Sequence, residues 1–147
     1  MVWYDRFFSK NNPENKIVSF EIITLRETGM RGSTEYEIVE KDGNAALTQY
    51  VIRYTQGKDQ RIPEKSAVVS TDMILEILNN CRILSWDGFN GPHPKGVLDG
   101  IMFRFDAIVN NGKKIYAHGS QNFPKHYREF RNALYEILSG HDVLPKE

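Results

Sequence analysis

The side chains of this sequence best suited to acid–base chemistry or metal binding are its four histidines, His93, His118, His126 and His141. A metal site would combine some of them with Asp87 or Asp99. However, no pair of histidines has the spacing of a known zinc motif, and the single Cys81 excludes a cysteine cluster. We therefore expect no metal and no other cofactor, and we expect His118 to be a core histidine that is hydrogen-bonded at the edge of a sheet.

Nucleophilic catalysis has weaker support. Ser120 lies two residues after His118, but the sequence contains no Gly-x-Ser-x-Gly turn of the kind that exposes a catalytic serine. We interpret Ser120 as a turn or capping residue. Cys81 lies on the apolar stripe of an expected helix, which favours a buried and unreactive thiol.

Residues 85–96 combine Gly and Pro with Trp86, Phe89 and His93. Gly and Pro disfavour regular structure there, and the aromatic side chains argue against a solvated linker. We expect an ordered loop in which both rings are largely buried, with a role in ligand recognition as the alternative. The Asp-Gly pairs at 87–88 and 99–100 fit turn positions.

A polar run over residues 119–122 leads into a helix expected to begin near Pro124. The first turn of this helix contains Lys125, His126 and Arg128, although acidic residues are favoured at that position. Its free N–H groups and this charge predict a site for a carboxylate or phosphate group, with a solvated helix end as the alternative. The candidate ligand-binding residues, at the end of the sheet where loop and helix meet, are Trp86, Asp87, His93, Asp99, His118, Ser120 and Lys125.

The elements that must position these residues follow from periodicity and turn signals. Strands are expected over residues 17–26, 34–40, 45–55, 98–109 and 113–118, with a loop or weak edge strand over 56–65. Helices are expected over residues 71–81 and 124–139, the first capped by the Ser70 region and the second ended by Gly140. This order predicts an α+β fold, a two-layer sandwich with an antiparallel sheet of five or six strands and both helices on one face. We expect a single domain over 1–147, with an aromatic segment and polar connector over 1–16 and the core over 17–140.

Two turn signals predict which side chains share a face of the sheet. A two-residue turn at Asp42 and Gly43 pairs Ile38 with Leu47 and turns both toward the core, together with Tyr36 and Val51. A two-residue turn at Asn111 and Gly112 gives a second register. The residues it turns toward the core are Ile101, Phe103, Phe105, Ala107, Tyr116 and His118. Those it turns away are Arg104, Asp106, Ile108, Ile115 and Ala117.

Tyr50, Ile52 and Tyr54 form an apolar column on the face opposite the core. A column of this kind is unusual on a wet face. Its cover is either the aromatic segment of this chain that holds Trp3, Tyr4, Phe7 and Phe8, or a protein partner or second copy.

Composition excludes several classes of protein. The 147 residues carry 19 basic and 19 acidic side chains, and the balance argues against a nucleic-acid binder that relies on bulk charge. No apolar run is long enough to span a membrane, and residues 1–6 do not have the layout of a secretory signal. We expect a cytoplasmic protein.

The loop at Trp86, the Asp99 and Gly100 pair and the run Gly119-Ser120-Gln121-Asn122-Phe123-Pro124 resemble small bacterial α+β proteins with a Gly-x-Asn-x-aromatic-Pro signature. Gln121 stands where that signature has Asn. The resemblance covers the chain from Trp86 onward and implies a bacterial source, with no activity to carry over.

Three functions remain open. The first is a non-enzymatic binding or protein-interaction module that uses residues 86–96 and the Tyr50 column. The second is a small hydrolase or isomerase built on His118, Asp99 and His93. The third is a structural subunit of a larger assembly. Neutral charge and the lack of a catalytic motif favour the first over the second.

Overall fold

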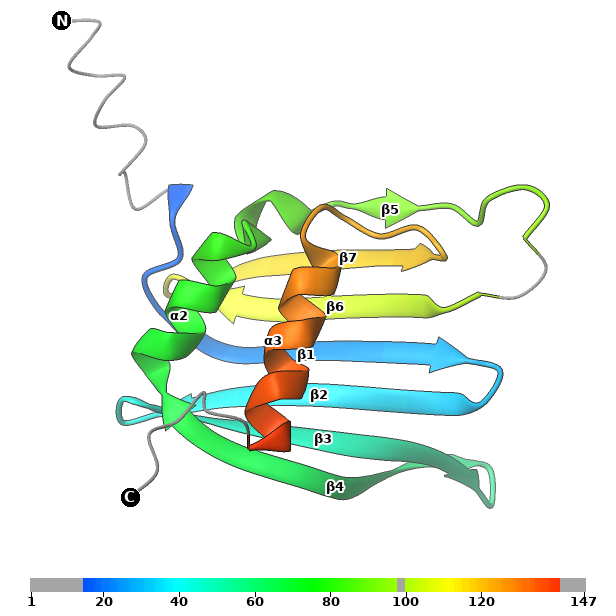
Figure 1. Ribbon diagram of the computed structural model, residues 1–147, viewed down its shortest axis with the longest axis horizontal. Coiled ribbons are helices and arrows are strands. Elements are labelled where there is room, and N and C mark those ends of the chain that lie inside the picture. Colours follow the sequence, from blue (N-terminus) through cyan, green and yellow to red (C-terminus); the bar gives the residue numbers. More distant parts are fainter. Residues whose placement is uncertain (1–14, 98–99, 141–147) are drawn as a thin grey trace, which may run out of the picture.

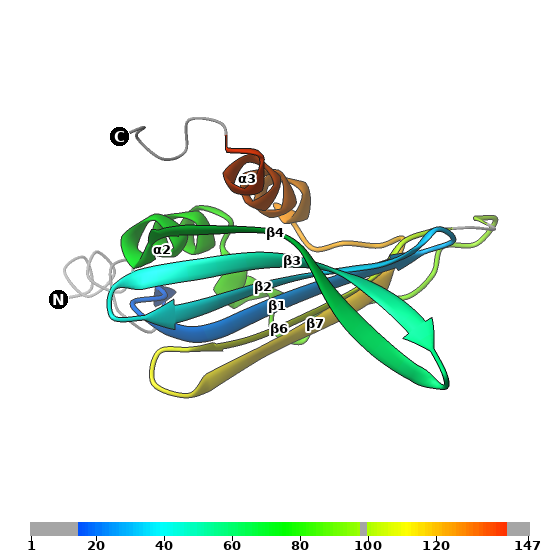
Figure 2. The same ribbon diagram turned by 90° about the horizontal axis from the view of Figure 1, so that it is seen from below.

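The computed structural model describes residues 15–97 and 100–140 of the chain, and it shows one sheet with helices packed on one face (Figures 1 and 2). The strands are β1 (Phe20–Gly29), β2 (Gly32–Lys41), β3 (Asn44–Thr55), β4 (Lys58–Ser70), β5 (Asn90–Gly91), β6 (Met102–Val109) and β7 (Lys113–Ser120). The helices are α2 (Thr71–Asn80), the 3-10 helix η2 (Ile83–Trp86) and α3 (Tyr127–Ser139). The predicted α+β class is confirmed.

The strand order is β4-β3-β2-β1-β6-β7-β5. All neighbours are antiparallel except β5, which pairs with β7 in parallel through Asn90 and His118 and through Gly91 and Gly119. The sheet therefore has seven strands and is mixed, whereas we expected five or six antiparallel strands. The missed strand is too short to leave a pattern in the sequence.

The core lies between the sheet and the two helices (Figure 2). One buried cluster joins Phe103 and Phe105 of the sheet to residues of both helices: Ile74, Leu78, Phe130, Leu134 and Ile137. Burial of such side chains is the main favourable contribution to folding.

The start of α2 is as predicted, but that of α3 is not. The Ser70 side chain accepts a hydrogen bond from the N–H of Met73, 3.1 Å away, and caps α2. At α3, the N–H of Tyr127 bonds to the carbonyl of Pro124 in a turn, and His126 takes a left-handed conformation with φ of 67°. The helix therefore begins at Tyr127, three residues after the expected position. Gly140 ends it in a left-handed conformation, as predicted.

The first hairpin has the predicted register. Ile38 pairs with Leu47 and Tyr36 with Gln49, and the side chains of Ile38, Leu47 and Tyr36 are buried. The long β4 continues this meander as the edge strand where we expected a loop or weak strand. Its Pro63 lies at a register shift, where an edge strand tolerates the missing N–H group.

The second hairpin has a different register from the predicted one. Val109 pairs with Lys113, so the loop holds three residues, Asn110, Asn111 and Gly112, all with positive φ. A shift of one residue moves every side chain of β7 to the other face. Tyr116 and His118 therefore point away from the core, whereas Ile115 and Ala117 are buried in it. Ile101, which precedes β6, is 40% exposed and does not belong to the core either.

Candidate functional site

Residues 87–92 form an ordered connection along β7. The N–H of Gly88 donates to the carbonyl of Tyr116 at 2.8 Å, and the N–H of His118 donates to the carbonyl of Phe89 at 3.1 Å. The Asp87 carboxylate accepts from the N–H of Tyr116 at 3.0 Å. Asp87 thus extends the pairing of β7 and has a structural role in the described chain.

Trp86 is buried and fixes the start of this connection. Its indole N–H donates to the carbonyl of Lys125 at 2.9 Å, and its ring contacts Phe105, Tyr127 and Phe130. The partly buried Phe89 packs near Phe103, with ring centroids 6.1 Å apart. The packing role expected of Trp86 is confirmed, and that of Phe89 in part.

Gly119 and Gly91 allow the 119–124 run to pack closely against its neighbours. A Cβ atom on Gly119 would lie 2.2 Å from the carbonyl oxygen of Asn122, and one on Gly91 would lie 2.6 Å from the same atom. The Asn122 amide also donates to the carbonyl of Pro92 at 3.3 Å. The segment before α3 is therefore pressed onto β5 and β7, and this explains the run without a ligand.

His93 and Ser120, both candidate ligand-binding residues, are in direct contact, a pairing that the sequence analysis did not predict. The Nδ1 atom of His93 lies 2.8 Å from the Ser120 hydroxyl, and its Nε2 atom contacts the carbonyl of Val97. A carbonyl only accepts, so Nε2 donates to Val97, and in the tautomer with its proton on Nε2 the Nδ1 atom accepts from Ser120. Hydroxyl and imidazole are the nucleophile and base of acyl-transfer enzymes. Here a neutral carbonyl orients the ring in place of a carboxylate.

Of the other predicted site residues that the structure describes, none forms a hydrogen bond or ion pair with His93 or Ser120. The ring of His118 lies on the outer face beside Tyr116, with centroids 5.4 Å apart. Lys125 is exposed and contributes its carbonyl to Trp86. Asp99 lies outside the described residues. Residues 87–97, the end of β7 and the segment before α3 therefore lie near one another, and the side-chain contact found there is that of His93 with Ser120.

A hollow of about 420 Å³ lies at the start of α3, and its lining includes Glu27, Phe123, His126 and Arg128. His118 and Lys125, expected at an anion site here, are not part of that lining. The two acidic side chains of the hollow have partners, since His126 contacts Glu129 at 2.7 Å and Glu27 is paired as described next.

Glu27 has two partners from α3. Its carboxylate accepts from the Tyr127 hydroxyl and from Nε of Arg131, the latter at 2.9 Å. Burial, followed by the charge of Glu27, raises the pKa of Tyr127. Burial opposes the charged form of Arg131, but attraction to Glu27 outweighs it and raises the pKa of that guanidinium too. The cluster thus fixes α3 on β1 with both groups protonated.

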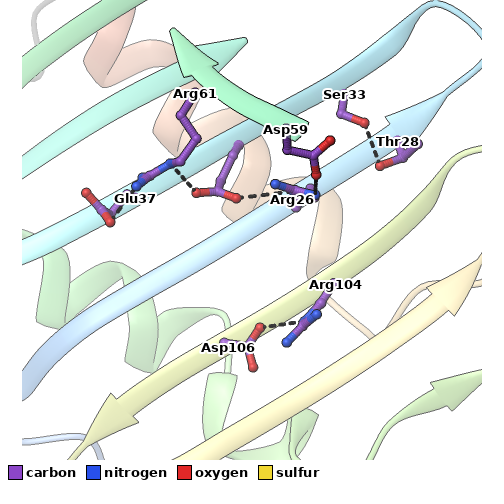
Figure 3. A network of polar contacts seen from close by, with 9 residues as sticks. Arg26, Thr28, Ser33, Glu37, Asp59, Arg61, Arg104 and Asp106 are labelled. Atoms are coloured by element: carbon purple, nitrogen blue, oxygen red, sulfur yellow. Dashed lines mark hydrogen bonds and ion pairs between the residues drawn. The ribbon is translucent and has the colours of Figure 1, made fainter. Parts of the chain in front are cut away.

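The face of the sheet opposite α2 and α3, which we call the helix-free face, bears a network of ion pairs (Figures 2 and 3). Arg26 contacts Glu35 at 3.2 Å and Asp59 at 3.4 Å. Arg61 contacts Glu35 at 3.0 Å and Glu37 at 3.1 Å. The network joins β1, β2 and the β3–β4 hairpin across the middle of the face.

The Tyr50 column lies on this face and receives part of its cover from β4. The Arg61 guanidinium lies 3.9 Å from the centre of the Tyr50 ring, and the Tyr50 hydroxyl donates to Glu37. Ile52 is half-buried, whereas Tyr54 is 70% exposed. A cover by Trp3 and its neighbours concerns residues outside the described chain.

A groove of about 410 Å³ opens on the same face between β1, β6 and β7. Its apolar lining includes Ile22 and Ile108, which pair across β1 and β6. Its lining also includes the exposed Tyr116 and the pair of Arg104 and Asp106. The side chains of this pair contact each other at 3.0 Å (Figure 3).

Two features, a cluster of metal-binding side chains and a membrane-spanning helix, are not found among residues 15–97 and 100–140. No three His, Cys, Asp or Glu side chains there are grouped so that they could hold a metal ion. No helix in this part of the chain is long and apolar enough to cross a bilayer.

Comparison with known proteins gives no family for this chain: no protein-family model matches it, and no significant match is found among curated proteins or solved structures.

Proposed function

We propose that the protein is a non-enzymatic interaction module that binds another protein through the helix-free face of its sheet. The groove between β1, β6 and β7 carries this proposal. Its apolar floor of Ile22 and Ile108 is framed by the Arg104–Asp106 pair and Tyr116. An apolar centre with a polar rim, rich in Tyr and Arg, is the anatomy of a protein interface.

The ion-pair network supports the same surface. Charged groups cost free energy when a partner covers them and leaves them unpaired. Arg26, Glu35 and Arg61 already have partners within the chain. A protein that covers this face would therefore leave no charge of these three without a counter-charge.

The test compares Tyr116→Ala with Tyr135→Ala, two exposed tyrosines on opposite faces. Proteins retained from a lysate of the source cells are identified, purified and titrated by calorimetry against the wild type and both variants. We expect Tyr116→Ala to weaken binding about tenfold or more, as for an interface hot spot, and Tyr135→Ala to match the wild type. Equal affinities for the two variants, or no partner that rebinds when purified, would contradict the proposal.

The contact between Ser120 and His93 favours a second candidate, hydrolysis of an activated ester or amide. Turnover of p-nitrophenyl acetate by the wild type is compared with that by Ser120→Ala and by a control, Ser85→Ala, at an exposed serine whose hydroxyl donates to the carbonyl of Arg82. Turnover lost only in Ser120→Ala would establish the hydrolase and overturn the non-enzymatic proposal.

A further inference from the structure

The outer edge of β4 differs between its two halves. Residues 58–65 carry Lys58, Asp59, Arg61, Glu64 and Lys65 together with a proline at the register shift. Charges, proline and bulges are the devices that prevent an edge strand from pairing with another chain. Residues 66–70, with the sequence Ser-Ala-Val-Val-Ser, have none of them. Within the described chain nothing pairs with their outer edge, since β4 ends the strand order.

This second half of β4 is complementary to itself. In an antiparallel pair centred on Val68, Ser66 would lie opposite Ser70 and Ala67 opposite Val69. Moving the centre to Ala67 would place Lys65 opposite Val69 instead. A two-fold symmetric contact requires such a self-matching surface.

A row of apolar side chains crosses the sheet and ends at residues 66–70 of β4. Ile108, Ile22, Val39, Ala46 and Val68 pair successively across β6, β1, β2, β3 and β4, all on the helix-free face. Val68 ends the row at the free edge and is 58% exposed. A second copy of this chain would add its own Val68 and continue the row.

We propose that two copies of this chain dimerise by antiparallel pairing of residues 66–70 of β4, which joins their sheets into one. Neither helix reaches beyond β4 in Figure 1, so α2 and α3 leave this edge accessible. Pairing over five residues buries less than the roughly 1,200–2,000 Å² of a stable interface. We therefore expect a dimer that depends on concentration in the micromolar to millimolar range.

The first test is the mass of the full chain by sedimentation or light scattering over that concentration range. We expect the wild type to rise from 17.0 kDa toward twice that mass. Val68→Lys should remain monomeric while keeping its fold, because the side chain is exposed in the monomer. The matched control Ile62→Lys, exposed in the charged half of β4, should dimerise like the wild type. A wild type that stays monomeric, or two variants that behave alike, would overturn the proposal.

A second test distinguishes edge pairing from stacking of the two helix-free faces. The native Cys81 is buried, so any disulfide that forms between two copies comes from the introduced cysteine. Residues opposite each other in antiparallel strands have Cβ atoms about 4.5–5.5 Å apart, so Val68→Cys should form a disulfide-linked dimer under mild oxidation. Val39→Cys should not, because five strand spacings of about 4.8 Å would separate its two copies. Cross-linking through Val39→Cys but not Val68→Cys would overturn edge pairing.

Discussion

Substitution of Gly119 tests whether residues 119–124 serve close packing and not ligand binding. In Gly119→Ala the new Cβ would lie 2.2 Å from the Asn122 carbonyl oxygen and 2.8 Å from a ring carbon of Phe103. The obstructing oxygen belongs to the backbone, so the segment before α3 has to move by about 1 Å to restore ordinary contact distances. Overpacking of this kind costs about 1–3 kcal/mol, and a backbone obstacle places this variant near the upper end.

The measurement is the free energy of unfolding in urea together with the thermal midpoint. A loss of about 3 kcal/mol lowers the midpoint of a chain of this length by roughly 6–12 °C. The matched control is Gly29→Ala, whose Cβ would meet only Ile101 at 3.8 Å and should change stability by about 0.5 kcal/mol or less. A Gly119→Ala protein as stable as the wild type would refute the close approach, and with it the structural reading of the run.

Three further predictions concern the core. Phe105→Ala should cost about 3–5 kcal/mol in urea unfolding, because Phe105 is fully buried beside Trp86 and Phe130; a loss under about 1 kcal/mol would contradict its place in the core. Tyr127→Phe should cost about 1.5–3 kcal/mol through the lost bond to the Glu27 carboxylate, an effect that a Glu27→Gln background should reduce. Burial raises the pKa of the Cys81 thiol to about 11, above that of about 8.5 in the unfolded chain. Its contribution to stability is therefore complete below about pH 8.5 and is lost as the pH rises toward 11, a decline that should be smaller in Cys81→Ala.

The two hairpins show how far the sequence predicts the sheet. Both contain an Asx-Gly pair between strand patterns, and the same turn rule predicts a two-residue loop in each. It holds at Asp42 and Gly43, where the loop has two residues. At the second hairpin, Asn110 also adopts positive φ, and its amide side chain binds the backbone of Lys16 and Val18. These distant contacts accompany the three-residue loop, and no local pattern reports them.

The candidate site could be predicted from the sequence less well than the core. The burial of Trp86 follows from its place beside apolar helices, and its role in packing was predicted. The contact of His93 with Ser120 depends on β5, a two-residue parallel strand that joins segments 28 residues apart. Likewise, the groove at Ile22 and Ile108 arises where β1 meets β6, far apart in the sequence. Side chains brought together only by such pairings have no shared signal along the chain.

The position of the β6–β7 hairpin has a consequence for synthesis of the chain. It lies between β1 and β5, two strands that both precede it in the sequence. While the ribosome makes residues up to about 100, β1 has an unpaired edge and β5 has no neighbour at all. Exposed edges of this kind are prone to aggregate. The nascent protein is therefore most vulnerable just before its last third emerges, and insertion of one hairpin then closes both edges together.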